Sequence, residues 1–372
     1  MKQKIYVTQP ALPPLEELLV SLRKIWESKI ITNNGPFHQQ FENDLAEYLG
    51  VKYISLFSNG MLALITAIQS MKISGEVITT PYSFVATTHA LWWNNIKPVF
   101  ADIDPVTFNL DPDKIEAAIT PKTTAILPVH VYGTPCDVTR IQEIADRYGL
   151  KLIYDAAHAF GVRLNGTSVA TFGDLSVLSF HATKVFNTFE GGAIICHDET
   201  TKQHIDQLKN FGIINETTVL TPGINAKMNE FQAALGILQL KYLDEAIGKR
   251  KILTERYREF FKNIPGISVM QDVPGIEYNF GYFPVLIDSV KLGRTRDEVY
   301  NKLKSHNIFS RRYFYPLISQ FPTYKGLPSS DPVNLPIAEK ITQQILCLPI
   351  YPDLEISNVK RVCELIIESV KV

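Results

Sequence analysis

The chain has 372 residues, of which 45% are hydrophobic and 20% charged, and its formal net charge at pH 7 is −1. This is the profile of a globular protein long enough for one large domain and a smaller one. A charge so close to zero provides no basic field for a nucleic-acid backbone, so no nucleic-acid partner is expected.

The 4 cysteines form no Cys-x-x-Cys pair and the 8 histidines are scattered. Neither a disulfide framework nor a metal site is therefore expected. The first residues lack the apolar run of a signal peptide, and no segment approaches the length of about 18 apolar residues that a membrane span needs. These observations predict a cytoplasmic protein without a membrane partner.

From about residue 50 the chain alternates short apolar runs with helical stretches, after one or two helices expected within 12–49. Strands are expected at 53–56, 76–79, 98–101, 125–131, 151–155, 175–180 and 192–196, and helices at 61–71, 84–94, 112–119, 137–148 and 200–211. This order predicts an α/β fold with a mostly parallel sheet covered on both faces. Ligands bind such sheets at the carboxyl ends of the strands.

A long helix is expected from Asn229 to about Lys262, because apolar residues recur there at helical spacing. Beyond it, an α+β lobe is expected, with a strand at 280–287 and helices at 294–306, 337–346 and 356–370. We therefore divide the chain into a large domain, 12–248, and a small C-terminal domain, 249–372, and we assign residues 1–11 to pack on the small domain.

Lys184 and Asp155 are the residues most indicative of chemistry. Asp155 closes one expected strand, and Lys184 follows the next and precedes Gly191-Gly192. A lysine amine can form a Schiff base with the aldehyde of pyridoxal 5'-phosphate, and an aspartate can keep the pyridine nitrogen of this cofactor protonated. The ordinary alternatives are a solvated lysine and a helix N-cap aspartate.

A phosphate site is expected at the strand-to-helix turn Ser58-Asn59-Gly60-Met61, with the hydroxyl of Ser179 on the same sheet edge. Taken alone, this turn would more often be an ordinary strand-to-helix loop. Phe84 could stack on a flat ring, and His158 could reach a phenolic oxygen of the cofactor. Each of these two residues, in isolation, is more often a core residue.

With these residues in view, the chain resembles the DegT/DnrJ/EryC1/StrS sugar aminotransferases, which have the type I aspartate-aminotransferase fold with a seven-stranded sheet in the large domain. The resemblance covers nearly the whole chain. Its most specific segments are Asp155-Ala156-Ala157-His158, Ser179-Phe180-His181-Ala182-Thr183-Lys184, Glu190-Gly191-Gly192 and Gly223-Ile224-Asn225-Ala226-Lys227-Met228-Asn229-Glu230.

The resemblance implies a role for each matching position. Lys184 would be the Schiff-base lysine, Asp155 the partner of the pyridine nitrogen, and pyridoxamine phosphate the intermediate form of the cofactor. The remaining implied contacts are His158 at the phenolic oxygen, Phe84 at the ring face, Gly60, Met61 and Ser179 at the phosphate, and Asn225 at the phosphate of a neighbouring subunit. A homodimer with shared active sites follows from the last of these.

Two positions depart from the family pattern. Met61 stands where threonine is frequent, so one hydroxyl to the phosphate is missing, and Lys227 stands where arginine is frequent. The chain keeps the lysine that dehydratase relatives replace with histidine, which favours transamination.

The resemblance implies L-glutamate as amino donor and a nucleotide-linked keto-sugar as acceptor. The acceptor expected first is dTDP-4-keto-6-deoxy-D-glucose, which would give dTDP-4-amino-4,6-dideoxy-D-glucose, a sugar of O-antigen and lipopolysaccharide biosynthesis. Amination at the 3-position and a UDP- or GDP-linked sugar stay open. Candidate substrate contacts are Arg311, Arg312, Tyr313 and Tyr315, whose alternative is a solvated basic pair beside core aromatics.

Two hypotheses from other functional classes are also compatible with the sequence. One is a cofactor-binding regulator without turnover, and the other is a decarboxylase or lyase of the same fold. Loss of the Schiff-base absorbance with glutamate would exclude the regulator, and formation of 2-oxoglutarate would exclude the decarboxylase or lyase.

Overall fold

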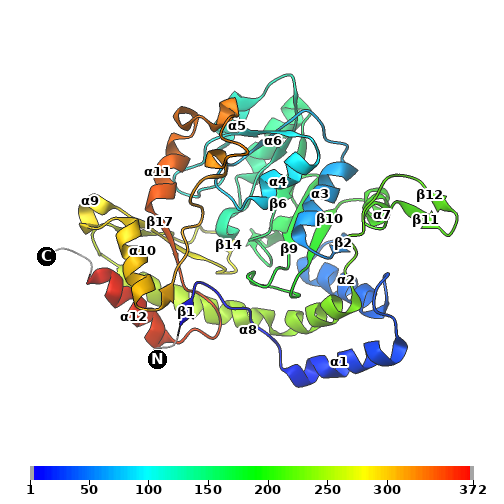
Figure 1. Cartoon of the computed structure of the whole chain (residues 1–372), viewed down its shortest axis with the longest axis horizontal. Coiled ribbons are helices and arrows are strands. Elements are labelled where there is room, and N and C mark those ends of the chain that lie inside the picture. The colour runs from blue at the N-terminus through cyan, green and yellow to red at the C-terminus, as the bar shows by residue number, and fades with distance from the viewer. Residues whose placement is uncertain (1–3, 369–372) are drawn as a thin grey trace.

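The computed structural model describes residues 4–368 (Figure 1). Its largest element is a seven-stranded sheet in the order β2-β10-β9-β6-β5-β3-β4. The strands are β2 (Tyr53–Phe57), β3 (Glu76–Thr79), β4 (Lys97–Phe100), β5 (Thr123–Leu127), β6 (Lys151–Asp155), β9 (Leu175–Ser179) and β10 (Gly192–Cys196). Only β10 runs antiparallel to its neighbours, β2 and β9. The expected α/β fold with a mostly parallel sheet is confirmed.

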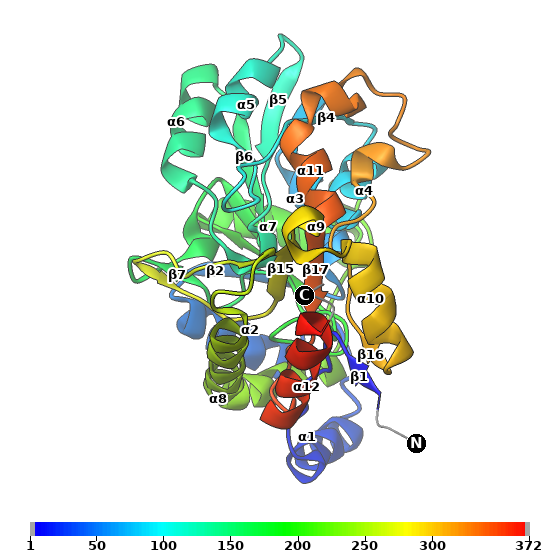
Figure 2. The same ribbon diagram turned by 90° about the vertical axis from the view of Figure 1, so that its left-hand side faces the viewer.

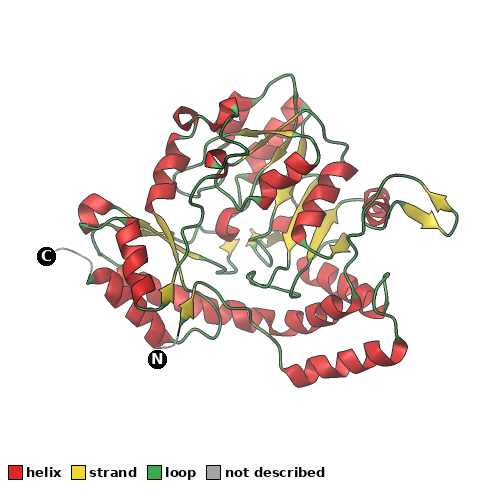
Figure 3. Cartoon of the chain, viewed as in Figure 1, coloured by secondary structure: helices red, strands yellow, loops and turns green. Residues whose placement is uncertain are grey.

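Helices cover both faces of this sheet (Figure 3). Buried side chains of α3 (Gly60–Ser70), α4 (Ala86–Trp93) and α7 (Glu199–Leu208) share one apolar cluster with the sheet. Two further clusters join the strands to α5 (Pro112–Ala118) and α6 (Val138–Tyr148), and to α2 (Pro36–Leu49) and α8 (Glu230–Phe261). The outlying helix α1 (Leu15–Ser28) lies along α8.

The 32-residue helix α8 runs from the large sheet to the C-terminal lobe (Figure 1). Asn229 caps it, because its side chain accepts from the Gln232 amide while the Gln232 side chain accepts from the Asn229 amide. The buried guanidinium of Arg250 donates to the Ile350 carbonyl over 2.9 Å, which fastens this helix to the lobe.

The C-terminal lobe is built on the antiparallel sheet β13-β15-β17 (Figure 2). Its elements are β13 (Ile267–Val269), β15 (Phe283–Ile287), α9 (Ser289–Leu292), α10 (Arg296–Ser305), β16 (Ile308–Phe309), α11 (Pro336–Gln344), β17 (Ile345–Leu348) and α12 (Ile356–Ile367). The N-terminal strand β1 (Ile5–Tyr6) pairs in parallel with β16. Short hairpin and connecting strands are β7 (Arg163–Leu164), β8 (Thr167–Ser168), β11 (Ile213–Asn215), β12 (Thr218–Val219) and β14 (Ile276–Glu277).

Several expected boundaries were wrong. The strand expected at 125–131 ends at Leu127, because Pro128 has no N–H to donate to a ladder. The helix expected at 337–346 ends at Gln344, and the following apolar run pairs with β15 as β17. The strand expected at 280–287 begins only at Phe283, and the end of the helix expected at 356–370 lies outside the described residues. The division at 248/249 stays a prediction.

No helix within residues 4–368 is long and apolar enough to cross a membrane.

Candidate active site

A cavity of about 690 Å³ lies at the carboxyl ends of β6 and β9. Lys184, Asp155, His158 and Ser179 border it from the large domain, together with Gly60, Met61 and Phe84. The C-terminal lobe closes it with Tyr282, Tyr313 and Phe314. Its volume falls in the range of small-molecule sites, and its position is the one expected for a ligand of a parallel sheet.

Lys184 follows β9 in a turn closed by a 2.8 Å bond from its own amide to the His181 carbonyl. Its side-chain amine donates to the phenolic oxygen of Tyr282 over 3.3 Å. Burial lowers the pKa of Lys184 to about 8, against the opposing charge of Asp155. A substantial fraction of this amine is therefore neutral, and so nucleophilic, near physiological pH.

Asp155 ends β6 and is only 4% exposed. One carboxylate oxygen accepts from the Thr87 hydroxyl at 2.8 Å, and the other accepts from the Ala157 amide at 3.1 Å. Burial raises the pKa of Asp155, while these two hydrogen bonds and the charge of Lys184 lower it. A cationic N–H placed against this desolvated carboxylate would favour its charged form.

His158 borders the same cavity and is 5% exposed, with its ring stacked on Phe314 at 5.9 Å between centroids. Its Nδ1 accepts from the Tyr132 amide at 3.2 Å, so the ring proton is assigned to Nε2. Burial and the charge of Lys184 hold the pKa of His158 well below its usual range. The ring is therefore a neutral hydrogen-bond donor rather than a cation.

The N-terminus of α3 forms an anion cradle against the sheet. Asn59 caps this helix by accepting from the Leu62 amide at 2.9 Å, and the next two amides, of Gly60 and Met61, fall outside the helical ladder. A side chain at Gly60 would lie 2.9 Å from Cβ of Ser179. Glycine is therefore needed for the helix terminus and the Ser179 hydroxyl to converge on one ligand group.

The other expected site residues lie in different settings. Phe84 is 58% exposed on the cavity wall, just before α4, and Tyr313 borders the cavity from the opposite lobe. Asn225 is exposed outside the cavity, where its side-chain oxygen accepts from Lys227 at 2.9 Å.

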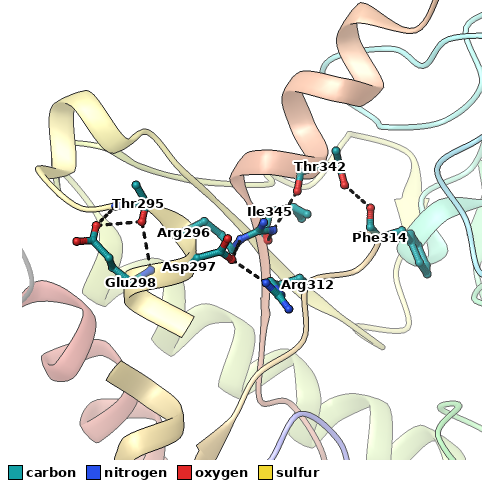
Figure 4. A network of polar contacts seen from close by, with 8 residues as sticks. All are labelled: Thr295, Arg296, Asp297, Glu298, Arg312, Phe314, Thr342 and Ile345. Atoms are coloured by element: carbon teal, nitrogen blue, oxygen red, sulfur yellow. Dashed lines mark hydrogen bonds and ion pairs between the residues drawn. The ribbon is translucent and has the colours of Figure 1, made fainter. Parts of the chain in front are cut away.

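The side chain of Arg312 does not border the cavity and belongs to a network of polar contacts (Figure 4). It donates to Asp297 at 2.9 Å, and the buried Arg296 donates to the same carboxylate oxygen at 2.6 Å. Tyr315 stacks against both guanidinium groups, 5.0 and 4.6 Å from its ring centroid. Arg311 is exposed, and its charge acts to lower the pKa of Tyr313, which burial raises to about 12. The network therefore fixes the segment that carries Tyr313 and Phe314.

Thr87, Tyr282 and Phe314 are among the lining residues that the sequence did not point to. Thr87 lies four residues after Ser83, and nothing in the sequence connects it with Asp155. Tyr282 and Phe314 come from the C-terminal lobe, and the only available signal was their place in aromatic-rich segments beside family-like motifs. Tyr282 and Phe314 become part of the cavity wall only through the packing of the C-terminal lobe against the large domain.

These residues fit a cofactor that carries a phosphate, an aldehyde and a ring nitrogen. The α3 terminus with Ser179 suits the phosphate, the partly neutral amine of Lys184 suits the aldehyde, and the desolvated carboxylate of Asp155 suits a protonated nitrogen. His158 supplies a neutral hydrogen-bond donor, its Nε2–H, in the same cavity. Within residues 4–368, no group of histidine, cysteine and carboxylate side chains is arranged to hold a metal ion.

Comparison with known proteins identifies the family of the chain. The sequence profile of the DegT/DnrJ/EryC1/StrS aminotransferase family matches residues 15–367. The chain is 54% identical, over 98% of both sequences, to the dTDP-4-amino-4,6-dideoxy-D-glucose transaminase of Escherichia coli. It also superposes on DesI, solved in the presence of its TDP-sugar product, with a TM-score of 0.95, 35% identity, and coverage of 100% of this chain and 94% of DesI.

A third similar protein is NtdA of Bacillus subtilis, solved with its bound cofactor PMP. Its TM-score is 0.87 and its identity 31%, over 96% of this chain and 82% of NtdA. The chain therefore belongs to the DegT/DnrJ/EryC1/StrS aminotransferase family and is a pyridoxal phosphate-dependent aminotransferase of the type I fold.

Proposed function

We propose that the protein transfers the amino group of L-glutamate to dTDP-4-keto-6-deoxy-D-glucose and so forms dTDP-4-amino-4,6-dideoxy-D-glucose. The observation that carries this proposal is the 54% identity, over nearly the full length of both chains, to an enzyme named for that product. The cavity between the lobes is large enough for a cofactor and a sugar together.

Pyridoxal phosphate, when bound, supplies the aldehyde that exchanges amino groups and the ring that accepts electrons. Lys184 is proposed to hold the cofactor through its amine and, once released, to move a proton from the amino donor. The lowered pKa of this amine, about 8, favours both tasks, because each needs the unprotonated nitrogen at its start. Asp155 holds a proton on the ring nitrogen by presenting a desolvated carboxylate.

The remaining site residues are proposed to bind and orient. The amides of Gly60 and Met61 and the hydroxyl of Ser179 hold the phosphate, and Nε2 of His158 donates to the phenolic oxygen. Because Met61 has no hydroxyl, the phosphate relies on backbone donors at that position. Phe84 from the large domain and Tyr313 from the C-terminal lobe both border the cavity and are proposed to contact the ring and the sugar. Arg311 and Tyr315, near Tyr313, are proposed to contact the diphosphate or the sugar, and Arg312 to hold this segment in place.

We further propose that the active unit is a homodimer in which Asn225 reaches the cofactor phosphate of the partner subunit. Three observations support this proposal. Asn225 is exposed and lies outside the cavity of its own chain. The β11–β12 hairpin projects from the body of the molecule and carries Val219 and Leu220, each 65% exposed (Figure 1). Trp26 on α1 is 74% exposed, which is costly for a side chain of this size in water.

The proposal is tested by incubating the purified holoenzyme with glutamate and a panel of nucleotide-linked keto-sugars, followed by mass spectrometry. Conversion of the dTDP-linked 4-keto-sugar, with little conversion of 3-keto-, UDP- or GDP-linked sugars, is the expected result. Preferred amination of another sugar in the panel would retain the aminotransferase and reject this substrate. A dimer that dissociates when Val219 and Leu220 are changed to serine would support the assembly.

A further inference from the structure

The loop that carries Tyr282 is fastened to the large domain close to Lys184. The side chain of Asn279, 1% exposed, donates to the carbonyls of His158 and Phe160, each at 2.9 Å. Its oxygen accepts from the Gly281 amide at 3.0 Å. A side chain at Gly281 would approach Cγ2 of Val185 to 2.8 Å, so the loop packs directly against the neighbour of the lysine.

These contacts place the ring of Tyr282 in the cavity wall, 4.8 Å from the His158 ring and 5.5 Å from the Tyr132 ring. Its phenolic oxygen then faces the Lys184 amine at 3.3 Å. Within residues 4–368, this is the one hydrogen bond found for that amine. Burial raises the pKa of Tyr282, so the phenol stays neutral at physiological pH and orients the amine without a full ion pair.

We propose that Tyr282 is a positioning residue that holds the Lys184 amine while this amine is not bonded to the cofactor. The inference rests on the proposed transamination. In that reaction the free amine takes one proton from a carbon and becomes an ammonium, and it later returns this proton to a second carbon. The Lys184 ammonium donates one N–H to the Tyr282 oxygen. The other two hydrogens of the ammonium are then directed at the cavity. No atom is gained or lost in this proton transfer.

The same contact acts before any cofactor binds. Three ionisable side chains face the Lys184 amine: Asp155, His158 and Tyr282. Of these, Tyr282 is the one that accepts a hydrogen bond from the amine, so it stabilises the ammonium form. Its removal lowers the pKa of Lys184 further, and this shift is measurable in cofactor-free protein.

The test is the variant Tyr282→Phe, which keeps the ring packing and removes the hydroxyl. We expect kcat to fall roughly tenfold to a hundredfold, the range of a hydrogen bond to a charged group, while KM for glutamate and for the sugar stays unchanged. In cofactor-free protein, the pH midpoint for capture of pyridoxal phosphate, read from absorbance, is expected to move to lower pH.

The matched control is Tyr278→Phe, in the same segment, whose hydroxyl accepts from the Val273 amide at 3.3 Å and does not border the cavity. It is expected to leave kcat and the capture midpoint unchanged. A second variant, Gly281→Ala, keeps the Tyr282 hydroxyl and pushes the loop away from Val185. It is expected to shift both quantities in the same direction as Tyr282→Phe.

An unchanged capture midpoint in Tyr282→Phe would overturn the inference, and so would equal losses of kcat in Tyr282→Phe and Tyr278→Phe. Failure of the proposed substrate is distinguishable from these results. In that case the holoenzyme would react with glutamate, and the capture midpoint would shift in Tyr282→Phe, without any aminated dTDP-sugar being formed.

Discussion

The Thr87 hydroxyl donates a 2.8 Å hydrogen bond to Asp155 and thereby joins the first turn of α4 to the end of β6. Both side chains are buried, at 1% and 4% exposure. Burial raises the pKa of Asp155, and this bond, the Ala157 amide and the charge of Lys184 act against that rise by favouring the charged carboxylate. Thr87, which no sequence motif indicated, thus contacts Asp155, the proposed partner of the pyridine nitrogen.

Thr87→Val is therefore expected to raise the pKa of Asp155 further, because a donor to the charged form is lost. Activity is present above the pKa of Asp155 and is lost as pH falls through it, so the acid limb of the kcat profile should move to higher pH. Thr88→Val is the control, since the neighbouring buried hydroxyl has no hydrogen-bond partner within the described residues. Identical acid limbs in the two variants would contradict the role of Thr87.

The rate at which cofactor-free enzyme captures pyridoxal phosphate should rise with pH through a midpoint of about 8. The neutral amine of Lys184 is the reacting form, and burial lowers its pKa to about 8. Stopped-flow absorbance measures this rate, and Lys184→Arg should show no capture. A midpoint near the ordinary lysine value of about 10.4 would show that the amine is solvated.

Gly60→Ala should weaken cofactor binding with little loss of folding stability. The added methyl group meets Cβ of Ser179 at 2.9 Å, which forces the α3 terminus and the hydroxyl apart. A cost of about 1 to 2 kcal/mol to the cofactor-bound state corresponds to a roughly fivefold to thirtyfold rise in the Kd of pyridoxal phosphate, measured by fluorescence titration. Gly248→Ala, in an open position on α8, should leave the Kd unchanged. Equal Kd values for the two variants would argue against the cradle.

Asp297→Asn should destabilise the C-terminal lobe, because the Arg296 and Arg312 guanidiniums then face each other without a shared anion. Burial acts to raise the pKa of Asp297, but hydrogen bonds from Arg312 and Arg296 leave it lowered overall. The stability from this carboxylate is therefore present above its unfolded pKa and is lost as pH falls through its lowered folded value.

Because the Asp297 side chain is 48% exposed, solvent screening limits the expected loss to about 1 kcal/mol in urea denaturation. The control Asp113→Asn breaks an ion pair whose side chains are 50% and 71% exposed, and should cause no measurable loss. If the two variants lost equal stability, Asp297 would be an ordinary surface charge.

The sequence predicted most of the large sheet because its strands are short apolar runs that end in recognisable turns. Lys184 and Asp155 were found for the same reason, since each follows or ends a strand and such ends meet at one edge. Tyr282 was not found, because it contacts Lys184 across a sequence separation of 98 residues that only the packing of the two lobes resolves. The expected helix at 337–346 included Ile345 and Leu346, the first two residues of β17, because these apolar residues directly continue the pattern of α11.

Arg312 shows another limit of reasoning from residue type. A pair of arginines beside tyrosines is typical of an anion site, but Arg312 forms an ion pair with Asp297 on α10. The sequence around Arg312 does not indicate that α10 packs next to it.

The most direct test of the central claim uses glutamate labelled isotopically at its nitrogen, the purified holoenzyme and dTDP-4-keto-6-deoxy-D-glucose. The account predicts a labelled dTDP-4-amino-4,6-dideoxy-D-glucose, identified by mass spectrometry and NMR, together with stoichiometric 2-oxoglutarate. Lys184→Ala should form neither product. Unlabelled or absent amino sugar in the presence of fully active cofactor would contradict the proposed donor, the acceptor or both.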